Sequence, residues 1–570
     1  MGLYTNNMPP TGPEQLNRRW PTWVGGEGDV THIYVSEYLK LGFTFEEAMK
    51  GVNAEIKKRV RSSPYNDNKI VTCKVFLPAG TFYISTPEAF IEQPEDRTCG
   101  LVIEGCGVDA TEIVYKPPEN ETFFWKNLDG SSTSGRSGFL FLTIRDVTFI
   151  CDAGDKTETG WMLSESSGGP QNYVFERVNW KGWVYGLHLI GDNNNSEMSW
   201  FHCGIYGDAW ESFLWMETSD QFCNYNFYAT QFEVYQGTMI RAQMGGSIFL
   251  RGGSLIHTGG GGVFFSLEGS GHAWGTTNFR CEGVRFETRT DDSSVIDCSW
   301  GDGNVAFVNC NNATSAREHS EDWVCWHFDC GNQKGPNVLF DSCCLIGKIQ
   351  IDFTYNTFDY PHNFYIQNCE FAQLLNDGND TPLKEPTDYV IFNSYDSGTE
   401  PNVNLGGNTV VHFVNCRHQS CDAEYAFWDC DIGLSTAARG YGREKIASVK
   451  YAAGCFPAGT VDGQPADEGT ANVNFTLPLG SVITKIFMAS NNTEIDSENT
   501  FRYTVQTRED TPTVLIEVIT NPQQDGGNIF NKTETMFYVC DTDAKRKLTL
   551  HADESVDWFD HQAVCWVYYI

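Results

Sequence analysis

The sequence of 570 residues is short of basic side chains. It carries 39 lysines and arginines against 74 aspartates and glutamates, a formal net charge of −35 at pH 7. A nucleic-acid-binding protein needs a basic face that displaces counterions from the phosphates, so this balance excludes a general nucleic-acid binder. The same charge makes binding to an anionic membrane surface unfavourable.

Long hydrophobic runs are also missing. No apolar stretch approaches the about 18 residues that a membrane-spanning helix needs. The first residues, Met1–Asn7, have neither the basic nor the apolar region of a signal peptide. We therefore expect no membrane insertion and synthesis in a cytosol. There the 20 cysteines would stay mostly reduced and pack as small core residues.

Helical signals are scarce, and one segment carries them. Apolar residues recur at helical spacing over residues 43–61. Thr44 and Glu47 precede the apolar run with the spacing of a capping box, which predicts a helix here. Elsewhere, the 55 glycines and 14% aromatic residues favour strands joined by tight turns.

Many strand-like segments follow one template, in which an apolar residue is followed by two variable residues and a cysteine. The clearest copies are Phe307-Val-Asn-Cys310, Phe340-Asp-Ser-Cys343, Ile366-Gln-Asn-Cys369 and Phe413-Val-Asn-Cys416. Looser copies start at Phe175, Phe201, Phe227, Phe249 and Phe279. These apolar anchors lie between 22 and 47 residues apart, a repeat length typical of solenoids and propellers. The unequal spacing favours a solenoid, because its insertions fall in loops.

A second strand-like segment follows the anchors. The segments that we align are Gly186–Ile190, Ser212–Glu217, Thr238–Gln243, Val263–Glu268, Ser294–Ser299, Cys325–Cys330, Lys348–Phe353 and Tyr425–Cys430. Two ladders in phase indicate coils with at least two strands each, stacked about 4.8 Å apart as in a parallel sheet. The predicted fold is therefore an all-β solenoid with a short N-terminal helix cap.

The chain divides into three predicted parts. Residues 1–70 form an N-terminal arm and capping helix, residues 71–445 the parallel β-helix, and residues 446–570 a C-terminal β-rich, sandwich-like domain. Its strongly apolar tail, Gln562–Ile570, predicts burial against another surface.

Three segments resemble phage tailspike and tail-fibre depolymerases with a pectate-lyase-like, right-handed single-stranded parallel β-helix. The resemblance rests on Phe76-Leu-Pro-Ala-Gly-Thr-Phe-Tyr-Ile84 after a helix, on Leu101-Val-Ile-Glu-Gly-Cys-Gly107, and on the cysteine ladder. Together with Gly28-Asp29-Val30 these segments cover about residues 28–430. The chain departs from the family where an acidic Asp-Asp-Thr run usually follows Gly-Asp-Gly, because Val30-Thr31-His32 stands there instead.

The resemblance implies a homotrimeric virion protein, assembled in the host cytoplasm and attached to other phage tail or baseplate proteins. Its C-terminal domain would then serve trimerisation or carbohydrate binding. It implies binding, and usually cleavage, of a bacterial surface polysaccharide such as capsule, O-antigen or exopolysaccharide. The family's catalytic positions vary, so none is carried over by motif.

Candidate catalytic residues come from the outward positions of the second ladder, since side chains alternate along a strand. Glycoside hydrolysis uses two carboxyl groups, one acid and one base or nucleophile. We predict four catalytic carboxylates: Glu217, Glu268, Asp297 and Asp329. Glu217 and Glu268 would lie two coils apart in one column, about 9–10 Å from each other. Asp297 and Asp329 would stack directly at about 5 Å, which would raise the pKa of one of them.

The same face carries candidates for sugar binding: Trp215, Arg241, Gln243, His327 and Asp352. Trp215 is either an exposed stacking residue or packed under a loop, and Arg241 could instead be the counter-ion of the acidic ladder. His327 could serve a lyase as its base. We predict no cofactor and no metal site, because Cys343-Cys344 lacks zinc-ligand spacing. The loop Gly259–Gly262 is either a turn between coils or a wall of the groove.

Four functions remain open from the sequence. The first is an endo-acting glycoside hydrolase with paired carboxylates. The second is a polysaccharide lyase on the same fold, which the scarcity of cations on this face disfavours. The third is an adhesin that binds glycan without cleaving it. The fourth is a purely structural appendage segment, which the tryptophan and carboxylates on one face disfavour.

Overall fold

The computed structural model describes residues 30–569 with internal gaps. The gaps are 64–68, 88, 119–121, 129–137, 154–157, 166–170, 191–194, 196, 218–223, 244–245, 269–277, 302, 313–318, 321, 331–334, 355–361, 373–388, 396–408, 420–424, 434–444, 453–459, 462–463, 466–469, 478, 493–500, 521–528 and 554–560. Two compact units are present, residues 1–278 and 279–570, and each is described by itself. The predicted arm up to residue 29 lies outside the described residues. The three-part division predicted from the sequence stays a prediction.

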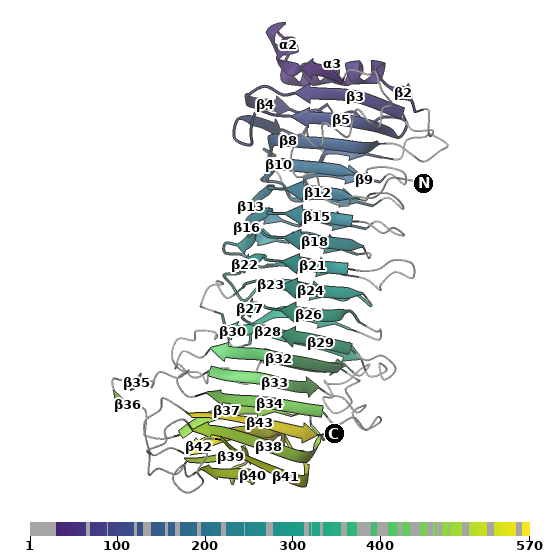
Figure 1. Cartoon of the computed structure of the whole chain (residues 1–570). Helices are drawn as coiled ribbons and strands as arrows, with labels where there is room; N and C mark the ends of the chain where they lie inside the picture. The colour runs from purple at the N-terminus through teal and green to yellow at the C-terminus, as the bar shows by residue number, and fades with distance from the viewer. Residues whose placement is uncertain are drawn as a thin grey trace. The chain divides into compact units, whose positions relative to one another are not determined.

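A helical cap begins the described part of the first unit. Strand β1 (Thr31–Tyr34) leads into α2 (Val35–Lys40) and then α3 (Phe45–Lys58), which lies across the first coils (Figure 1). The predicted capping box is confirmed, since Glu47 N–H donates to the Thr44 hydroxyl and Thr44 N–H to the Glu47 carboxylate. The apolar face of α3 is buried. The sequence analysis did not predict α2, whose six residues are too few for a periodic pattern.

Parallel strand pairing through the first unit confirms the predicted β-helix. One row pairs in the order β3 (Lys69–Phe76), β5 (Thr98–Glu104), β8 (Phe139–Cys151), β10 (Tyr173–Lys181), β12 (Met198–Phe201), β15 (Asn224–Tyr228) and β18 (Ser247–Arg251). A second row contains β4 (Gly80–Ile84), β6 (Thr111–Tyr115), β13 (Gly204–Trp210), β16 (Gln231–Gly237) and β19 (Ser254–His257). The third row is β7 (Phe123–Asn127), β9 (Gly160–Ser164), β11 (Tyr185–Leu189), β14 (Ser212–Met216), β17 (Ile240–Ala242) and β20 (Gly262–Leu267). One coil thus has three strands, as in β12, β13 and β14.

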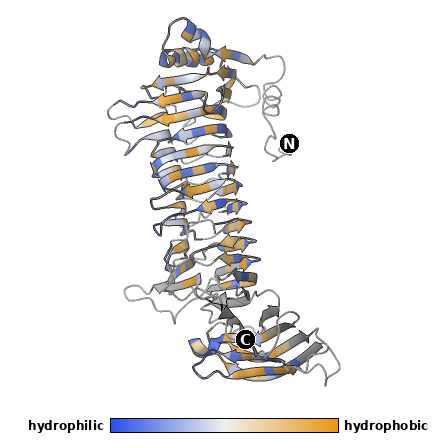
Figure 2. Cartoon of the chain, turned by 90° about the vertical axis from the view of Figure 1, so that its left-hand side faces the viewer, coloured by the Kyte–Doolittle hydropathy of each residue, from blue (hydrophilic) through white to orange (hydrophobic). Residues whose placement is uncertain are grey.

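Aromatic residues from successive coils fill the interior of this unit. Phe175, Trp200 and Phe227 pair in register and are buried, and their rings stack along the coil axis. Polar and apolar residues are interspersed along the strands (Figure 2), as expected when one face of each strand is buried. The anchors predicted at Phe201 and Phe249 were wrong by one residue. The buried side chains are Trp200 and Leu250, and a slip of one residue turns a side chain to the opposite face.

The second unit repeats the arrangement with the clearest copies of the template. Its first row pairs β24 (Asn304–Val308), β26 (Asn337–Asp341), β29 (His362–Gln367) and β32 (Thr409–Gln419). Its other rows contain β23 (Ser293–Cys298), β25 (Val324–Asp329), β28 (Lys348–Thr354) and β31 (Val390–Tyr395), and the short β22 (Arg285–Glu287), β27 (Cys344–Leu345) and β30 (Glu370–Ala372). Strand β21 (Asn278–Glu282) spans the division between the units.

The template has a conformational cause at its third position. Asn309, Ser342, Asn368 and Asn415 all adopt a positive φ of 51–57°. Asparagine tolerates this left-handed conformation better than most residues, which explains its place before the buried cysteine. The turn lets the chain leave one row and enter the next.

Parallel pairing ends at β32, where β33 (Tyr425–Gly433) pairs antiparallel. The assignment of Tyr425–Cys430 to the second ladder was therefore wrong, because its alternation fits a hairpin equally well. Two four-stranded antiparallel sheets follow, consistent with the expected sandwich-like domain. They are ordered β34 (Lys445–Ala452), β43 (His561–Tyr569), β38 (Val482–Asn492), β41 (Ile529–Val539), and β37 (Thr470–Thr476), β42 (Lys547–Asp553), β39 (Phe501–Thr507), β40 (Val514–Thr520).

The apolar tail lies inside this domain as β43, between β34 and β38. Cys565, Val567 and Tyr569 are buried. Its hydrophobicity therefore has an explanation within one chain and does not itself indicate a subunit interface.

The cysteines that the structure describes are free thiols, most of them buried. Burial raises the pKa of Cys203 and Cys298 to about 12, so these thiols stay protonated at neutral pH. In the described part of the chain, every helix is too short or too polar to serve as a membrane span.

Candidate active site

The outward face of the third row in the first unit carries five of the nine predicted site residues. Register places His188, Trp215, Arg241 and Ser266 side by side on successive coils, and we name this set the aromatic column. Two residues further along each strand lies the carboxylate column, defined by Glu165, Ile190, Glu217, Gln243 and Glu268. The ladder of backbone hydrogen bonds fixes this second column. Glu217 and Glu268 are thus two coils apart in one column, as the sequence analysis predicted.

Trp215 is enclosed by its neighbours in the aromatic column. The His188 ring stacks on it at 3.9 Å between centroids, and the Arg241 guanidinium carbon lies 4.7 Å from the indole centroid. Tyr185 adds a third contact at 5.7 Å. Coils in register bring these flat groups together, so the indole faces are covered and the expected open stacking platform is not present.

Arg241 binds two carboxylates at the rim of this face. Its Nε and Nη2 donate to the two oxygens of Glu268 at 2.9 and 3.3 Å, and Nη1 lies 4.0 Å from Glu211. Arg241 therefore acts as the counter-ion that the sequence left as its second interpretation.

Glu268 is held in its ionised form. Its partial burial would raise its pKa, but hydrogen bonds from Ser266, Arg241 and Gln243 outweigh burial and lower the pKa below its ordinary value. Glu268 is therefore a poor proton donor at neutral pH and a fixed acceptor.

Glu217 has a different partner. Its carboxylate lies 2.8 Å from His188 Nε2. Burial lowers the pKa of His188, although Glu217 and Glu165 act in the opposite direction, so the imidazole is neutral at pH 7. A neutral imidazole can donate a hydrogen bond to this carboxylate.

The other four predicted residues lie in the second unit. Asp297 pairs in register with His327, and Asp329 with Asp352. The predicted direct stack of Asp297 on Asp329 was therefore wrong by two residues. A two-residue shift keeps every side chain on its face, so alternation alone cannot distinguish the two registers.

His327 is clamped between two carboxylates. Its Nδ1 lies 2.9 Å from the Asp297 carboxylate, and its Nε2 lies 2.9 Å from the Asp352 carboxylate. Gln350 donates to both oxygens of Asp352 at 3.0 Å. Burial acts to lower the pKa of His327, but the hydrogen bonds and charges of the two aspartates raise it to about 10. The ring is therefore protonated at neutral pH, which contradicts its interpretation as a lyase base.

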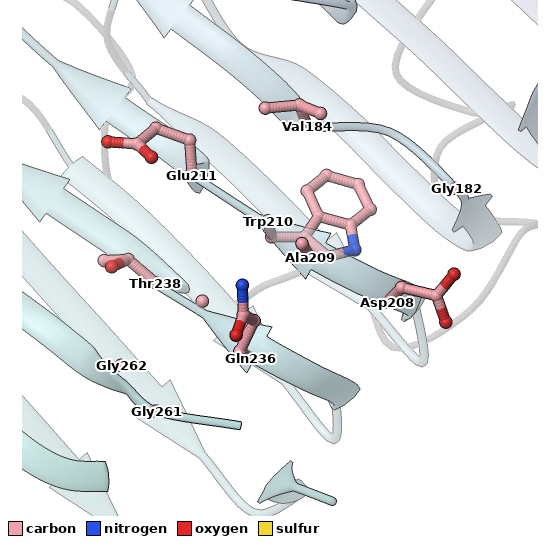
Figure 3. Close-up of a pocket in the computed structure, with 11 residues that line it drawn as sticks. Gly182, Val184, Asp208, Ala209, Trp210, Glu211, Gln236, Thr238, Gly261 and Gly262 are labelled. Atoms are coloured by element: carbon pink, nitrogen blue, oxygen red, sulfur yellow. The ribbon is translucent and has the colours of Figure 1, made fainter. Parts of the chain in front are cut away.

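A cavity of about 590 Å³ opens on the first unit (Figure 3). Its lining includes Asp208, Glu211, Gln236 and Thr238, together with Gly261 and Gly262 of the predicted groove wall. Glu211 links this cavity to Arg241. Sequence reasoning missed His188, Asp208 and Glu211, although His188 occupies the same strand position as Trp215 and could have been found from it.

Within the described ranges, no group of three or more histidine, cysteine, aspartate or glutamate side chains is arranged to hold a metal ion.

The strand pairing decides the fold. The chain is a parallel β-helix protein. A search of solved structures finds a tailspike of E. coli bacteriophage HK620 bound to a pentasaccharide, the class that the sequence resembles, with a TM-score of 0.33 and 8% identity over 98% of this chain and 94% of that chain. It also finds the A-module of the Azotobacter vinelandii mannuronan C-5 epimerase AlgE6, with a TM-score of 0.23 and 11% identity over 68% of this chain and 93% of that chain. No protein-family model and no curated protein sequence matches.

Proposed function

We propose that this chain is a phage tailspike that binds a bacterial surface polysaccharide and cleaves it by glycosidic hydrolysis. The observation that carries the proposal is the carboxylate column. It presents Glu217 and Glu268 on one outward face with opposite environments, one beside a neutral imidazole and one fixed as an anion. Paired carboxyl groups with divided roles are what glycoside hydrolysis requires.

In this proposal Glu217 is the general acid and Glu268 the general base. Glu217 gives its proton to the leaving glycosidic oxygen as the bond to the anomeric carbon breaks. A water molecule forms the new bond to that carbon and passes its proton to Glu268. Two coil steps separate the residues by about 9–10 Å, near the about 6.5–9.5 Å typical of inverting enzymes. We therefore expect inversion of the anomeric centre.

Gln243 lies between the two glutamates in the column and is a candidate ligand for a sugar hydroxyl. Trp215 would act through its neighbours, holding His188 and Arg241 in place rather than stacking on a sugar. In the second unit, we propose that Asp297, His327 and Asp352 bind sugar hydroxyls, with Asp329 beside them. We assign no catalytic step there, because the protonated His327 already satisfies two of these carboxylates.

A lyase is the second candidate, favoured by one observation. His188 is a neutral base on the same column as a cation, Arg241, and elimination needs both. The guanidinium is, however, bound to Glu268 and less available to a substrate carboxylate. An adhesin would use the same face without any reaction.

The proposal includes a homotrimer carried on the virion, assembled in the host cytoplasm and joined to other tail or baseplate proteins. Exposed apolar side chains on the edge strands β40 and β41 support a subunit contact in the C-terminal domain. Phe537 is 79% exposed and Ile519 53% exposed. Exposed apolar edge strands are usually covered in natural proteins.

The test is incubation of the purified chain with capsule, O-antigen and exopolysaccharide preparations from a bacterial panel. Products are sized and assayed for new reducing ends and for unsaturated uronates. Fragments with reducing ends and no unsaturation are expected. Unsaturated products would replace the hydrolase with the lyase, and binding without fragments would leave an adhesin.

A further inference from the structure

The cavity of about 590 Å³ in the first unit falls within the size range of ligand pockets, and none of the lining residues that the structure describes belongs to the carboxylate column. It is bounded by four successive coils. Gly182 and Val184 come from one coil, residues 208–211 from the next, and Gln236–Thr238 with Gly261 and Gly262 from those that follow. In Figure 3 the Asp208 and Glu211 carboxylates lie at opposite sides of the Trp210 indole, with Gln236 and Thr238 on the neighbouring strand.

Backbone rather than side chains forms one wall of the cavity. Gly237 and Gly262 both have a φ of +135°. A Cβ atom on Gly237 would lie 2.1 Å from the Trp210 carbonyl oxygen, and one on Gly262 would lie 2.7 Å from the Gly237 carbonyl oxygen. Only glycine fits these positions, so successive coils pack closely along this wall.

The charges facing the cavity are mainly negative. Asp208 and Glu211 are both exposed. The cations nearby are already engaged, since Arg241 is bound to Glu268 and Lys181, beside Gly182, lies 3.6 Å from Asp109. A carboxylate brought here by a ligand would meet two like charges, which is unfavourable in a partly desolvated site.

An open aromatic ring stands beside this cavity. Tyr235 is 51% exposed and lies opposite Asp208, since Gly207 pairs with Val234 and Ala209 with Gln236. The glycine loop packs against the Tyr235 ring, since a Cβ atom on Gly259 would lie 2.5 Å from a ring carbon. A ring of this kind can stack on the apolar face of a pyranose.

We propose that this cavity is a subsite that selects a sugar unit without a carboxylate, and that it binds an amino sugar more tightly than a neutral one. The inference rests on the proposed polysaccharide-binding function and names the substrate class of its subsite. Asp208 and Glu211 accept from ammonium or hydroxyl groups, and Tyr235 provides the stacking face. Uronic acid units are excluded by charge.

The experiment measures binding of three tetrasaccharides to the full chain by saturation-transfer NMR and calorimetry. The probes are glucosamine, N-acetylglucosamine and galacturonate tetramers, which are cationic, neutral and anionic. We expect affinity to fall in that order, with the cationic probe at least tenfold tighter than the anionic one, because charge-assisted hydrogen bonds are worth about 1.5–3 kcal/mol. Equal or tighter binding of galacturonate, or no binding of any probe, would overturn the inference.

Variants locate the preference. The double variant Asp208→Asn with Glu211→Gln should lose about tenfold in affinity for the cationic tetramer and little for the neutral one. Tyr235→Ala should weaken both. The matched control is Glu233→Gln, which removes an exposed carboxylate from the neighbouring strand β16 outside the cavity lining. An equal loss of affinity in the control would show that the effect comes from the overall charge of the protein, and it would overturn the proposed site.

The two proposals fail separately in these experiments. Charge-ordered binding without cleavage of any polysaccharide removes the hydrolase and keeps the subsite. Cleavage of a polysaccharide, together with equal affinity for the three tetrasaccharides or tighter binding of the anionic one, removes the subsite and keeps the hydrolase.

Discussion

Single residues decide the protonation of the proposed site. Glu268 and Glu217 occupy equivalent strand positions, yet an arginine faces one and a neutral histidine the other. A carboxylate is assigned as acid or base by such neighbours rather than by its own chemistry. The pH dependence of activity therefore reports directly on Arg241.

Replacing Arg241 by glutamine should raise the pKa of Glu268, because the variant loses a charged donor to that carboxylate. As the solution is acidified, Glu268 would then become protonated at a higher pH than in the wild type. We expect the acidic limb of the kcat/KM profile on the cleaved polysaccharide to move to higher pH. Arg251→Gln, an exposed arginine of β18, is the control and should leave the limb in place. An unmoved limb in the Arg241 variant would contradict the role of this ion pair.

His327 should make stability depend on pH in the alkaline range. Its folded pKa of about 10 lies above the ordinary 6.5, so the folded chain binds the extra proton. The resulting stabilisation is full below about pH 6.5 and is lost as pH rises toward 10. Chemical denaturation of wild type and His327→Gln at several pH values checks this. The difference in their free energies of unfolding should shrink between pH 6.5 and 10, and a constant difference would refute the clamped imidazolium.

At the scale of strands and turns, the sequence predicted the ladders well and their register less well. Phe307, Phe340, Ile366 and Phe413 do pair in sequence, because asparagine and cysteine mark the turn after each strand. At His202 the third template position is neither asparagine nor serine, and there the predicted anchor was displaced by one residue.

Which side chains of the third row face outward could be predicted only in part, for a related reason. Strict alternation along these strands would also turn Phe213, Met239, Phe264 and Val295 outward, but they are fully buried. They stand near the start of third-row strands, where the chain turns a corner and two consecutive side chains face the interior. Alternation therefore holds only from the middle of each strand onward, where Trp215, Glu217 and Glu268 lie. The cavity draws on strands of the second and third rows and on loops between them, which no single-strand pattern reveals.

The left-handed conformation at the third template position should contribute to the stability of the fold. Asn368 has a φ of 55°, donates to Asp341 at 3.2 Å and accepts from Asn415 at 2.9 Å. Asn368→Ala should lower the free energy of unfolding by about 1–3 kcal/mol through backbone strain and lost hydrogen bonds. Asn368→Gly should lose less, since glycine keeps the conformation.

Thermal and urea denaturation measure both variants. Asn304→Ala, a strand asparagine without a positive φ, is the matched control and should cost less than Asn368→Ala. Equal losses of unfolding free energy in the Asn368→Ala and Asn304→Ala variants would show that the turn conformation does not stabilise the fold.

At the scale of the whole molecule, the proposed homotrimer is a testable property. Sedimentation equilibrium should give the mass of three chains. Phe537→Asp, which places a charge on the exposed edge strand β41, should shift the population toward monomer. Phe43→Asp on the helical cap, another exposed phenylalanine, should not. A monomeric wild type would contradict the assembly, and a trimer unaffected by Phe537→Asp would place the interface elsewhere.

The central claim, hydrolysis by Glu217 and Glu268, is tested most directly by one rate comparison. The polysaccharide that wild type cleaves is treated with Glu217→Gln, Glu268→Gln and Glu165→Gln, and reducing ends are counted over time. Glu165 is the third carboxylate of the same column and serves as the control. The account predicts a loss of at least about a hundredfold for each of the first two variants, as expected for removal of a general acid or base, and little loss for the third. Near-normal rates for Glu217→Gln and Glu268→Gln would contradict it.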